Sequence, residues 1–198
     1  MGIRITEEMR VTARKESGRR AAYIQHHFGV GHLTPEETDE IGFLGEFACC
    51  ELLGIDWRGN IRDNYYTIDS GDININNKIF DVKTETIPQP YFDAVINRRI
   101  KDDELYGRRL INEQQFQLLN HYDYVIFGGF VRDAGYNTWY PLGYIDVQTI
   151  IENYRPITKR PDGGGDYPSP AVAIKTSEIG RVNRLMAYVQ ALQSNFTH

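Results

Sequence analysis

The chain has 198 residues, ordinary apolar and charged fractions and a net charge of −5. This length predicts a single domain over residues 1–198 with room for a full core. The negative balance argues against a protein that coats nucleic acid by bulk charge, but it allows an enzyme with a local basic groove. Because the sequence shows neither a membrane-spanning run nor a signal peptide, we expect a cytoplasmic protein with no membrane partner.

Two helices are expected in the first quarter of the chain. Residues 6–27 are polar and basic and follow a helical pattern. A second helix should begin at Thr34-Pro35-Glu36-Glu37, because the threonine can cap, the proline suits the first turn and Glu37 completes a capping box. It should run to about Leu53, where Gly54 offers a C-terminal stop.

The pattern changes to β over residues 65–86. Asp72–Ile75 alternates, Asn76-Asn77 predicts a tight turn, and the alternation returns from Ile79 to Glu85. Further elements are expected in this order: a helix at 102–120, a buried strand at 124–127, a strand at 139–145, a loop at 160–170, a short strand at 171–174 and a helix at 182–192. This order predicts an α/β fold with one central mixed sheet flanked by helices.

Positive residues gather in two places, which suggests either a groove for an anionic partner or ordinary solvated helix faces. The first group is Arg10, Arg14, Lys15, Arg19 and Arg20, and the second is Arg98, Arg99, Lys101, Arg108 and Arg109.

The hairpin carries a group of charged side chains on one face. If Asn76 and Asn77 form a two-residue loop, Asp72 lies opposite Asp81. Their backbones are then within about 5 Å of each other, and two like charges so placed destabilise a sheet unless a cation lies between them. Lys83 projects from the same face, because side chains alternate along a strand. Carboxylate oxygens suit Mg²⁺, and a lysine can stabilise developing charge.

Alternatives to this interpretation stay open at the level of the hairpin. The face could be a solvated surface, since Asp-x-Lys is a weak pattern. Asp69 replaces Asp72 if the register is different. Glu85 shares the face and is a weaker candidate, expected to be a surface residue.

The second helix contains a carboxylate among apolar neighbours. Glu46 shares a face with Phe43, Cys49, Cys50 and Leu53, and the opposite side of the helix is apolar as well. A buried carboxylate needs a partner, which is either a structural arginine or lysine or a metal centre. The two adjacent cysteines are expected to be reduced and buried.

These features together resemble the PD-(D/E)XK nuclease superfamily. The resemblance lies in the order of a helix with Glu46, a strand with Asp72 and then Asp81-Val82-Lys83 on the next strand. The later segments at 114–119, 122–127 and 139–145 resemble the core order of that family. It covers roughly residues 34–150, with 1–33 as a basic N-terminal extension and 151–198 as a C-terminal loop and helix. No proline precedes Asp72, which departs from the family's pattern.

The resemblance implies a restriction-endonuclease-like core and phosphodiester hydrolysis with Mg²⁺, for which Mn²⁺ can substitute. Asp72, Asp81 and the backbone carbonyl of Val82 would bind the metal. Lys83 would orient water or stabilise phosphate charge, and Glu46 would support the metal. The expected partner is nucleic acid, DNA rather than RNA, and we expect the chain to work as a homodimer or within a larger assembly.

Two other functional classes compete with an endonuclease. The first is an inactive nuclease-like fold that serves as a nucleic-acid or protein-binding module. The second is an unrelated α/β domain whose acidic residues are solvated. Loss of magnesium-dependent cleavage on removal of Asp81 or Lys83 distinguishes the enzyme from both.

Overall fold

The computed structural model describes residues 1–21, 32–62, 65 and 72–194. Its larger sheet has the strand order β1-β6-β5-β3-β2. The strands are β1 (Ile3–Arg4), β2 (Ile73–Ile75), β3 (Lys78–Ile87), β5 (Tyr124–Val131) and β6 (Thr138–Asp146). β3 pairs in parallel with β5, and every other neighbouring pair of strands is antiparallel. The fold is therefore α/β with a mixed sheet, as predicted.

A second sheet, which the sequence did not predict, packs near the first. It is antiparallel and consists of β4 (Arg108–Asn112), β8 (Asp166–Lys175) and β7 (Ile157–Lys159), in the order β4-β8-β7. The expectation of one central sheet is therefore wrong. The loop expected at 160–170 is confirmed for residues 160–165 but is wrong for residues 166–170, which belong to β8. The strand expected at 171–174 is confirmed and is the C-terminal part of the longer β8.

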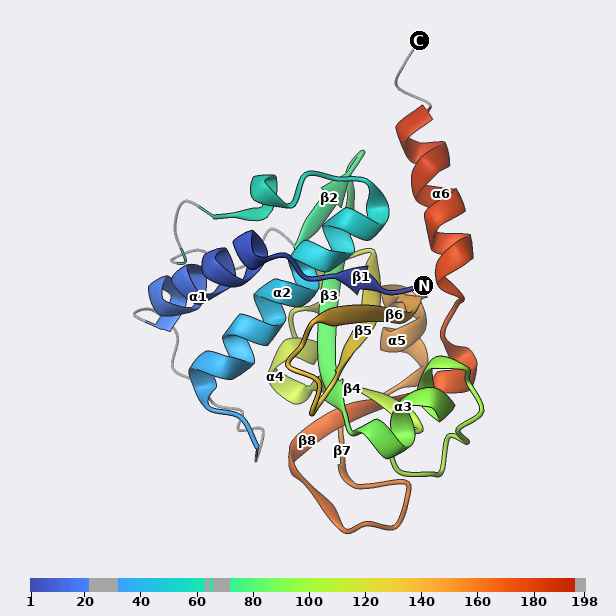
Figure 1. Cartoon of the computed structure of the whole chain (residues 1–198). Helices are drawn as coiled ribbons and strands as arrows, with labels where there is room; N and C mark the ends of the chain where they lie inside the picture. Colours follow the sequence, from blue (N-terminus) through green and yellow to red (C-terminus); the bar gives the residue numbers. More distant parts are fainter. Residues whose placement is uncertain (22–31, 63–64, 66–71, 195–198) are drawn as a thin grey trace.

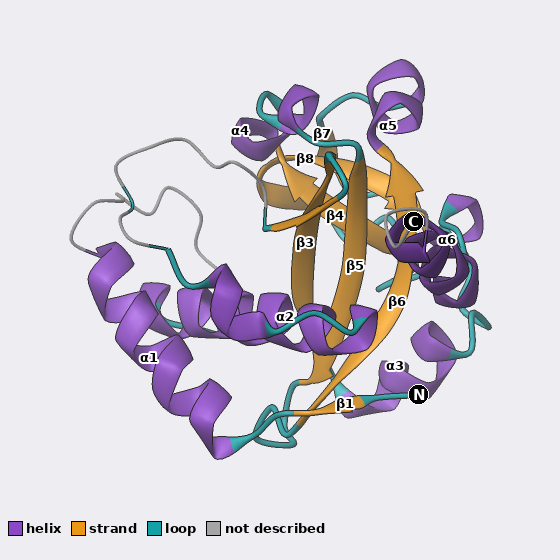
Figure 2. Ribbon diagram, turned by 90° about the horizontal axis from the view of Figure 1, so that it is seen from above, coloured by secondary structure: helices purple, strands orange, loops and turns teal. Residues whose placement is uncertain are grey.

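The helices cover both sides of the larger sheet. They are α1 (Glu7–Ala21), α2 (Pro35–Leu53), α3 (Gln89–Ile96), α4 (Glu113–Phe116), α5 (Val147–Asn153) and α6 (Val182–Ser194). Short 3-10 helices cover Trp57–Asn60, Leu119–His121 and Thr176–Glu178. Figures 1 and 2 show α2 crossing β3, with α1 packed outside α2. In the described part of the chain, no helix has the length and apolar character that crossing a membrane requires.

The signals expected at the ends of the second helix are confirmed. The Thr34–Glu37 capping box forms, and Gly54 ends α2 in a left-handed conformation with φ of 71°. The first helix is confirmed from Glu7 to Ala21, and the rest of its expected range lies outside the described residues.

The helix expected at 102–120 is wrong. The chain instead forms turns, the strand β4 and the four-residue α4. Along β4 the buried side chains are Arg109 and Ile111, whereas Leu110 is exposed. This alternation has the period of a strand, and pairing with β8 outweighs the local helical preference.

Two hydrophobic cores lie on the two faces of the larger sheet. The first joins α1 and α2 to one face of β3, and it includes Phe43, Phe47 and Phe80. The second lies between the larger sheet and the three-stranded sheet, and it includes Ile111, Phe127 and Ile174. β3 and β5 are thus buried on both faces, and β3 carries the candidate site between the cores.

Candidate functional site

The hairpin forms in the expected register. Asn76 and Asn77 have positive φ angles of 50° and 64°, which suit a tight two-residue turn. Ile73 pairs with Phe80, and Ile75 pairs with Lys78. The side-chain assignment that places Asp81 and Lys83 on one face of β3 therefore rests on a confirmed register.

Asp72 lies just before β2 and binds the backbone of β3. Its N–H donates to the carbonyl oxygen of Phe80 at 3.1 Å. Its carboxylate Oδ2 accepts a 2.6 Å hydrogen bond from the N–H of Val82. Asp72 is 6% exposed. These two bonds fix Asp72 against β3, directly before β2 begins.

The direction of the Val82 carbonyl follows from the hydrogen bonds of β3. Odd-numbered residues face β5, because the carbonyl of Ile79 accepts from Asp123 N–H and that of Ile87 accepts from Arg132 N–H. Backbone groups alternate sides along a strand, and the N–H and C=O of one residue point the same way. The carbonyl of Val82 thus points away from β5, to the side on which the N–H of Val82 donates to Asp72.

Asp81 and Lys83 form a contact pair on the adjoining face. Lys83 Nζ lies 2.8 Å from Asp81 Oδ1. Asp81 is 4% exposed, and its second oxygen, Oδ2, is buried without a hydrogen-bond partner among the described residues. A buried acceptor of this kind is costly, which makes it a ready ligand for a cation or a donor that enters the site.

The charges that act on Lys83 come from the hairpin and from α2. Burial lowers the pKa of Lys83, but the carboxylates of Asp81, Asp72 and Glu46 raise it, and the pKa stays above its ordinary value. All three candidate carboxylates therefore act on one ammonium group, which remains charged at neutral pH.

Glu46 is buried on α2 as expected, with 5% of its surface exposed. Its Oε2 accepts a 3.1 Å hydrogen bond from Asn60 Nδ2. Its charge also acts on the two cysteines, which are free and buried. Burial first, and then the charges of Glu46 and Asp72 among others, raise the pKa of Cys50 to about 12, so this thiol is not a nucleophile at neutral pH.

Two polar residues that the sequence did not single out contact the carboxylates. Asn60 binds Glu46, and Arg62 Nη2 lies 3.1 Å from Asp72 Oδ1. Both follow Trp57, whose ring packs 4.8 Å from that of Phe47, the neighbour of Glu46 in the chain. The buried Trp57 thus holds this segment against α2. The sequence signal that could have located this segment is Asp56-Trp57, because Asp56 caps the short 3-10 helix that begins at Trp57.

The other residues that the sequence singled out are not part of this site. Glu85 is not a plain surface residue, because it forms an ion pair with the buried Arg109 of β4. Asp69, the alternative to Asp72, lies outside the described residues. Several residues of the two basic groups have structural partners: Arg14 pairs with Glu40, Arg19 with Glu16, Arg20 with Asp39, and Arg98 with backbone carbonyls.

No family model matches the chain, and the comparisons with curated proteins and with solved structures likewise found no match.

Within residues 1–21, 32–62, 65 and 72–194, no three histidine, cysteine, aspartate or glutamate side chains stand close enough together to form a metal-binding group. Lys83, Arg62 and Asn60 contact the carboxylates instead.

The donor set nevertheless fits a hard divalent cation. Asp72, Asp81 and Glu46 carry carboxylate oxygens of the kind that such a cation prefers, and the carbonyl of Val82 points to the side of Asp72. Mg²⁺ takes one or two carboxylates and keeps several waters, so it does not require three protein ligands in contact. The unpartnered Oδ2 of Asp81 is the observation in favour of this fit.

Proposed function

We propose that this chain is a metal-dependent nuclease with a PD-(D/E)XK-type site in a restriction-endonuclease-like core. Its substrate would be DNA rather than RNA, cut as an endonuclease does, and its assembly a homodimer. The observation that carries this proposal is the buried Asp81, with Oδ1 on Lys83 and Oδ2 without a hydrogen bond among the described residues, opposite Asp72 in the register of the hairpin.

Each residue has a role that follows from its contacts. Asp72 and Asp81 would hold Mg²⁺ or Mn²⁺ together with the Val82 carbonyl, with Glu46 in support. When bound, the ion supplies Lewis-acid stabilisation of phosphate charge and activates water as a nucleophile. Lys83 stays protonated and donates to a phosphate oxygen as negative charge develops there. The 2.6 Å bond between Asp72 and Val82 keeps the site in place.

Cleavage of plasmid DNA with Mg²⁺ or Mn²⁺ tests this proposal. We expect Asp81→Asn and Lys83→Ala each to lower the rate at least about a hundred-fold, because each removes charge stabilisation from the transition state. Asn74→Ala is the matched control, since Asn74 is exposed on the same hairpin and pairs in register with Ile79 rather than with a site residue. Equal cleavage by wild type, Asp81→Asn and Lys83→Ala would refute the proposal.

A second candidate function is a binding module without catalysis. The observation that favours it is that Lys83 and Arg62 already contact the carboxylates of Asp81 and Asp72. Such a module would bind DNA equally well with and without divalent ions and would cut neither DNA nor RNA under any condition that allows metal binding.

A further inference from the structure

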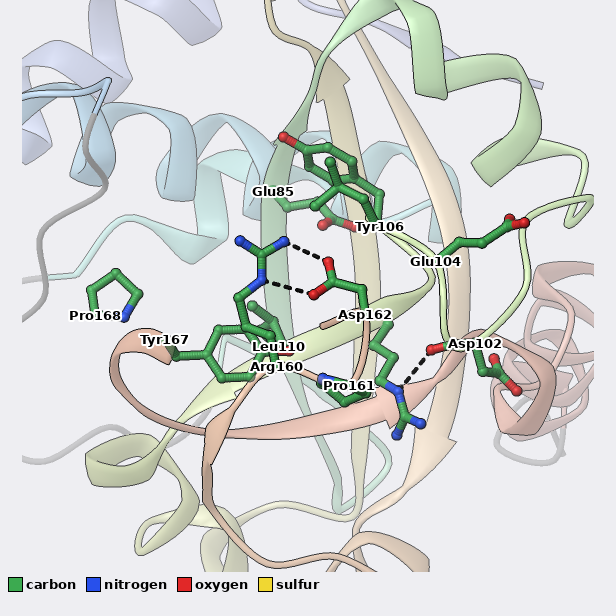
Figure 3. Close-up of a pocket in the computed structure, with 12 residues that line it drawn as sticks. Glu85, Asp102, Glu104, Tyr106, Leu110, Arg160, Pro161, Asp162, Tyr167 and Pro168 are labelled. Atoms are coloured by element: carbon green, nitrogen blue, oxygen red, sulfur yellow. Dashed lines mark hydrogen bonds and ion pairs between the residues drawn. The ribbon is translucent and has the colours of Figure 1, made fainter. Parts of the chain in front are cut away.

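A groove runs between the three-stranded sheet and the chain that connects α3 to β4. It consists of a cavity of about 240 Å³ that adjoins a second of about 590 Å³. The two share Glu104, Leu105, Arg160 and Asp162 in their walls. Figure 3 shows the first cavity, with Tyr106 on one side and Tyr167 on the other. None of the roles proposed so far involves this groove.

Three large apolar side chains in the walls of the groove are partly exposed. Leu110, Leu105 and Tyr91 are 41%, 37% and 37% exposed, and all three belong to its walls. Together with the ring of Tyr167 they provide flat and apolar contacts. Aromatic and aliphatic walls of this kind accept planar rings, with polar groups at the edges that fix orientation.

One ion pair joins two residues of the cavity wall. The guanidinium of Arg160 binds both oxygens of Asp162, at 3.1 and 2.5 Å. Glu85 pairs with Arg109, which lies behind the wall. The wall carries more carboxylates than guanidinium groups, so it disfavours a phosphate inside the cavity and suits a neutral occupant with both donors and acceptors. A nucleobase has this chemistry, with two apolar faces and a polar edge.

The cavity also lies next to the candidate site along β3. Glu85 belongs to its wall and follows Lys83 by two residues, so both project from the same face about 7 Å apart. Nucleotides advance by about 3.4 Å each along a stacked strand. A strand with a phosphate at Lys83 would therefore bring a base one or two nucleotides away to this cavity.

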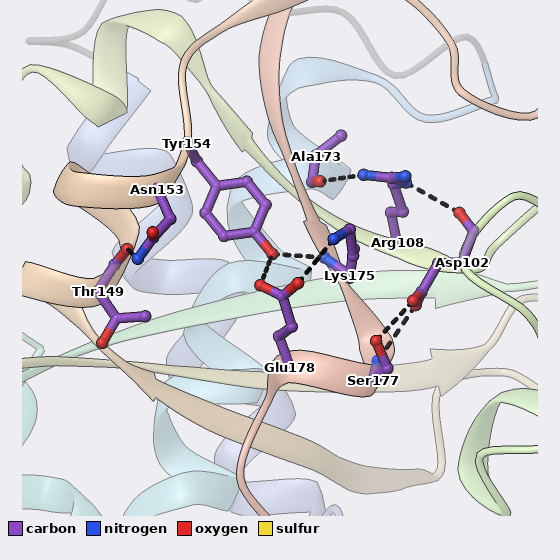
Figure 4. A network of polar contacts seen from close by, with 9 residues as sticks. All are labelled: Asp102, Arg108, Thr149, Asn153, Tyr154, Ala173, Lys175, Ser177 and Glu178. Carbon is purple, nitrogen blue, oxygen red and sulfur yellow. Dashed lines mark hydrogen bonds and ion pairs between the residues drawn. The ribbon is translucent and has the colours of Figure 1, made fainter.

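The wall of the cavity is held in place before any ligand binds. Arg108 donates from Nε to the carbonyl of Asp102 at 2.8 Å and from Nη1 to that of Ala173 at 3.0 Å. The carboxylate of Asp102 accepts from the N–H and hydroxyl of Ser177, at 3.1 and 2.5 Å. Figure 4 shows how this network joins the loop to the end of β8. A preformed wall lowers the entropic cost of binding.

We propose that this cavity is a subsite for one unstacked nucleobase of the substrate strand, adjacent to the phosphate at Lys83. This inference rests on the proposed function for its choice of ligand. The base stacks against Tyr167 and Leu110, and its polar edge meets the paired Arg160 and Asp162. Enzymes that accept an extrahelical base use such a combination of stacking walls and edge contacts.

The test uses the full chain carrying Asp81→Asn and a short single-stranded DNA that contains one 2-aminopurine. The second probe is the same DNA with an abasic site at that position. We expect the fluorescence of 2-aminopurine to change on binding, and the abasic DNA to bind about ten-fold more weakly, because stacking of one base is lost. Leu110→Asp and Tyr167→Ala should cause a similar loss with the first probe.

The matched control is Ile157→Asp. Ile157 is 38% exposed on β7 of the same sheet but does not belong to the walls of the groove, so its variant should bind as the parent does. Equal binding of the two probes, or equal binding by Leu110→Asp and the parent, would overturn the subsite. Cleavage is measured separately in chains that keep Asp81. If Leu110→Asp cleaves as the wild type does alongside such a result, the nuclease proposal stands without the subsite. Base-dependent binding by Asp81→Asn, together with no metal-dependent cleavage by the wild type, would keep the subsite and refute the nuclease proposal.

Discussion

At the scale of single residues, the carboxylates of the candidate site are engaged by the chain's own cations. Arg62 contacts Asp72, and Lys83 contacts Asp81. The two cations differ in origin, because Lys83 is on the same strand as Asp81, whereas Arg62 belongs to the segment anchored by Trp57. A divalent ion at Asp72 must compete with Arg62, and a phosphate that enters the site offers Arg62 a new partner.

This competition predicts opposite effects of Arg62→Ala on metal binding and on catalysis. Removing the guanidinium leaves Asp72 with more negative potential, so Mn²⁺ should stabilise the variant at several-fold lower concentrations in a thermal-shift titration. Cleavage should become slower, because a phosphate contact is lost. Arg14→Ala is the control, since the guanidinium of Arg14 pairs with Glu40 rather than with a carboxylate of the candidate site. Unchanged or weaker Mn²⁺ binding in Arg62→Ala would contradict the competition.

The sequence revealed those site residues that are fixed by local geometry. The adjacent Asn76 and Asn77 adopt positive φ angles, and this turn sets the register that places Asp81 and Lys83 on one face. Asn60 and Arg62 could not be found in this way, because their positions depend on the packing of Trp57 against Phe47. Contacts between segments with no shared periodicity leave no pattern in a single sequence.

At the scale of elements, the approach of α2 to β3 depends on a glycine. A Cβ at Gly45 would lie 1.8 Å from Thr84 Oγ1, which also accepts from Trp139 Nε1 at 3.2 Å. Glu46 follows Gly45 in α2, so the close approach of α2 to β3 at Gly45 also sets the position of Glu46. A larger residue at position 45 must therefore push the helix from the strand and move Glu46 away from Lys83.

Two glycine substitutions in α2 separate this contact from the intrinsic preference of the helix. Gly45→Ala should lower the free energy of unfolding by about 1–3 kcal/mol through overpacking, and should slow cleavage. Gly42→Ala has open space around the new methyl group and should raise the free energy of unfolding by about 0.5–1 kcal/mol. Urea unfolding of both variants measures the difference. Stabilisation by Gly45→Ala would show that α2 does not pack this closely on β3.

Elements with strong local signals were predictable, and those made by long-range pairing were not. The capping box and Gly54 marked both ends of α2. By contrast, β4 pairs with β8 across more than fifty residues, and the burial of the charged Arg109 in β4 concealed its strand periodicity. The ion pair that makes this burial tolerable involves Glu85 on β3, which the sequence of β4 does not contain.

At the scale of the whole molecule, the two hydrophobic cores share β5. Ile126 and Phe130 belong to the core under α2, whereas Val125 and Phe127 belong to the core under the three-stranded sheet. Because β5 contributes residues to both cores, the loss of either core exposes one face of a strand on which the other core also depends. The candidate site on β3 and the groove beside it are thus supported by both cores.

This sharing predicts that the chain unfolds as one cooperative unit. Trp57 and Trp139 both report on the first core. Ile174→Ala creates a cavity in the second core, and we expect it to lower the free energy of unfolding by about 2–5 kcal/mol. Its urea midpoint should fall equally by tryptophan fluorescence and by far-ultraviolet circular dichroism. Ile157→Ala, on the exposed β7, should change the free energy of unfolding measured by either probe by less than about 0.5 kcal/mol. A fluorescence midpoint that does not move in Ile174→Ala would instead mean that the second sheet unfolds on its own, and that the groove can open while the acidic site stays folded.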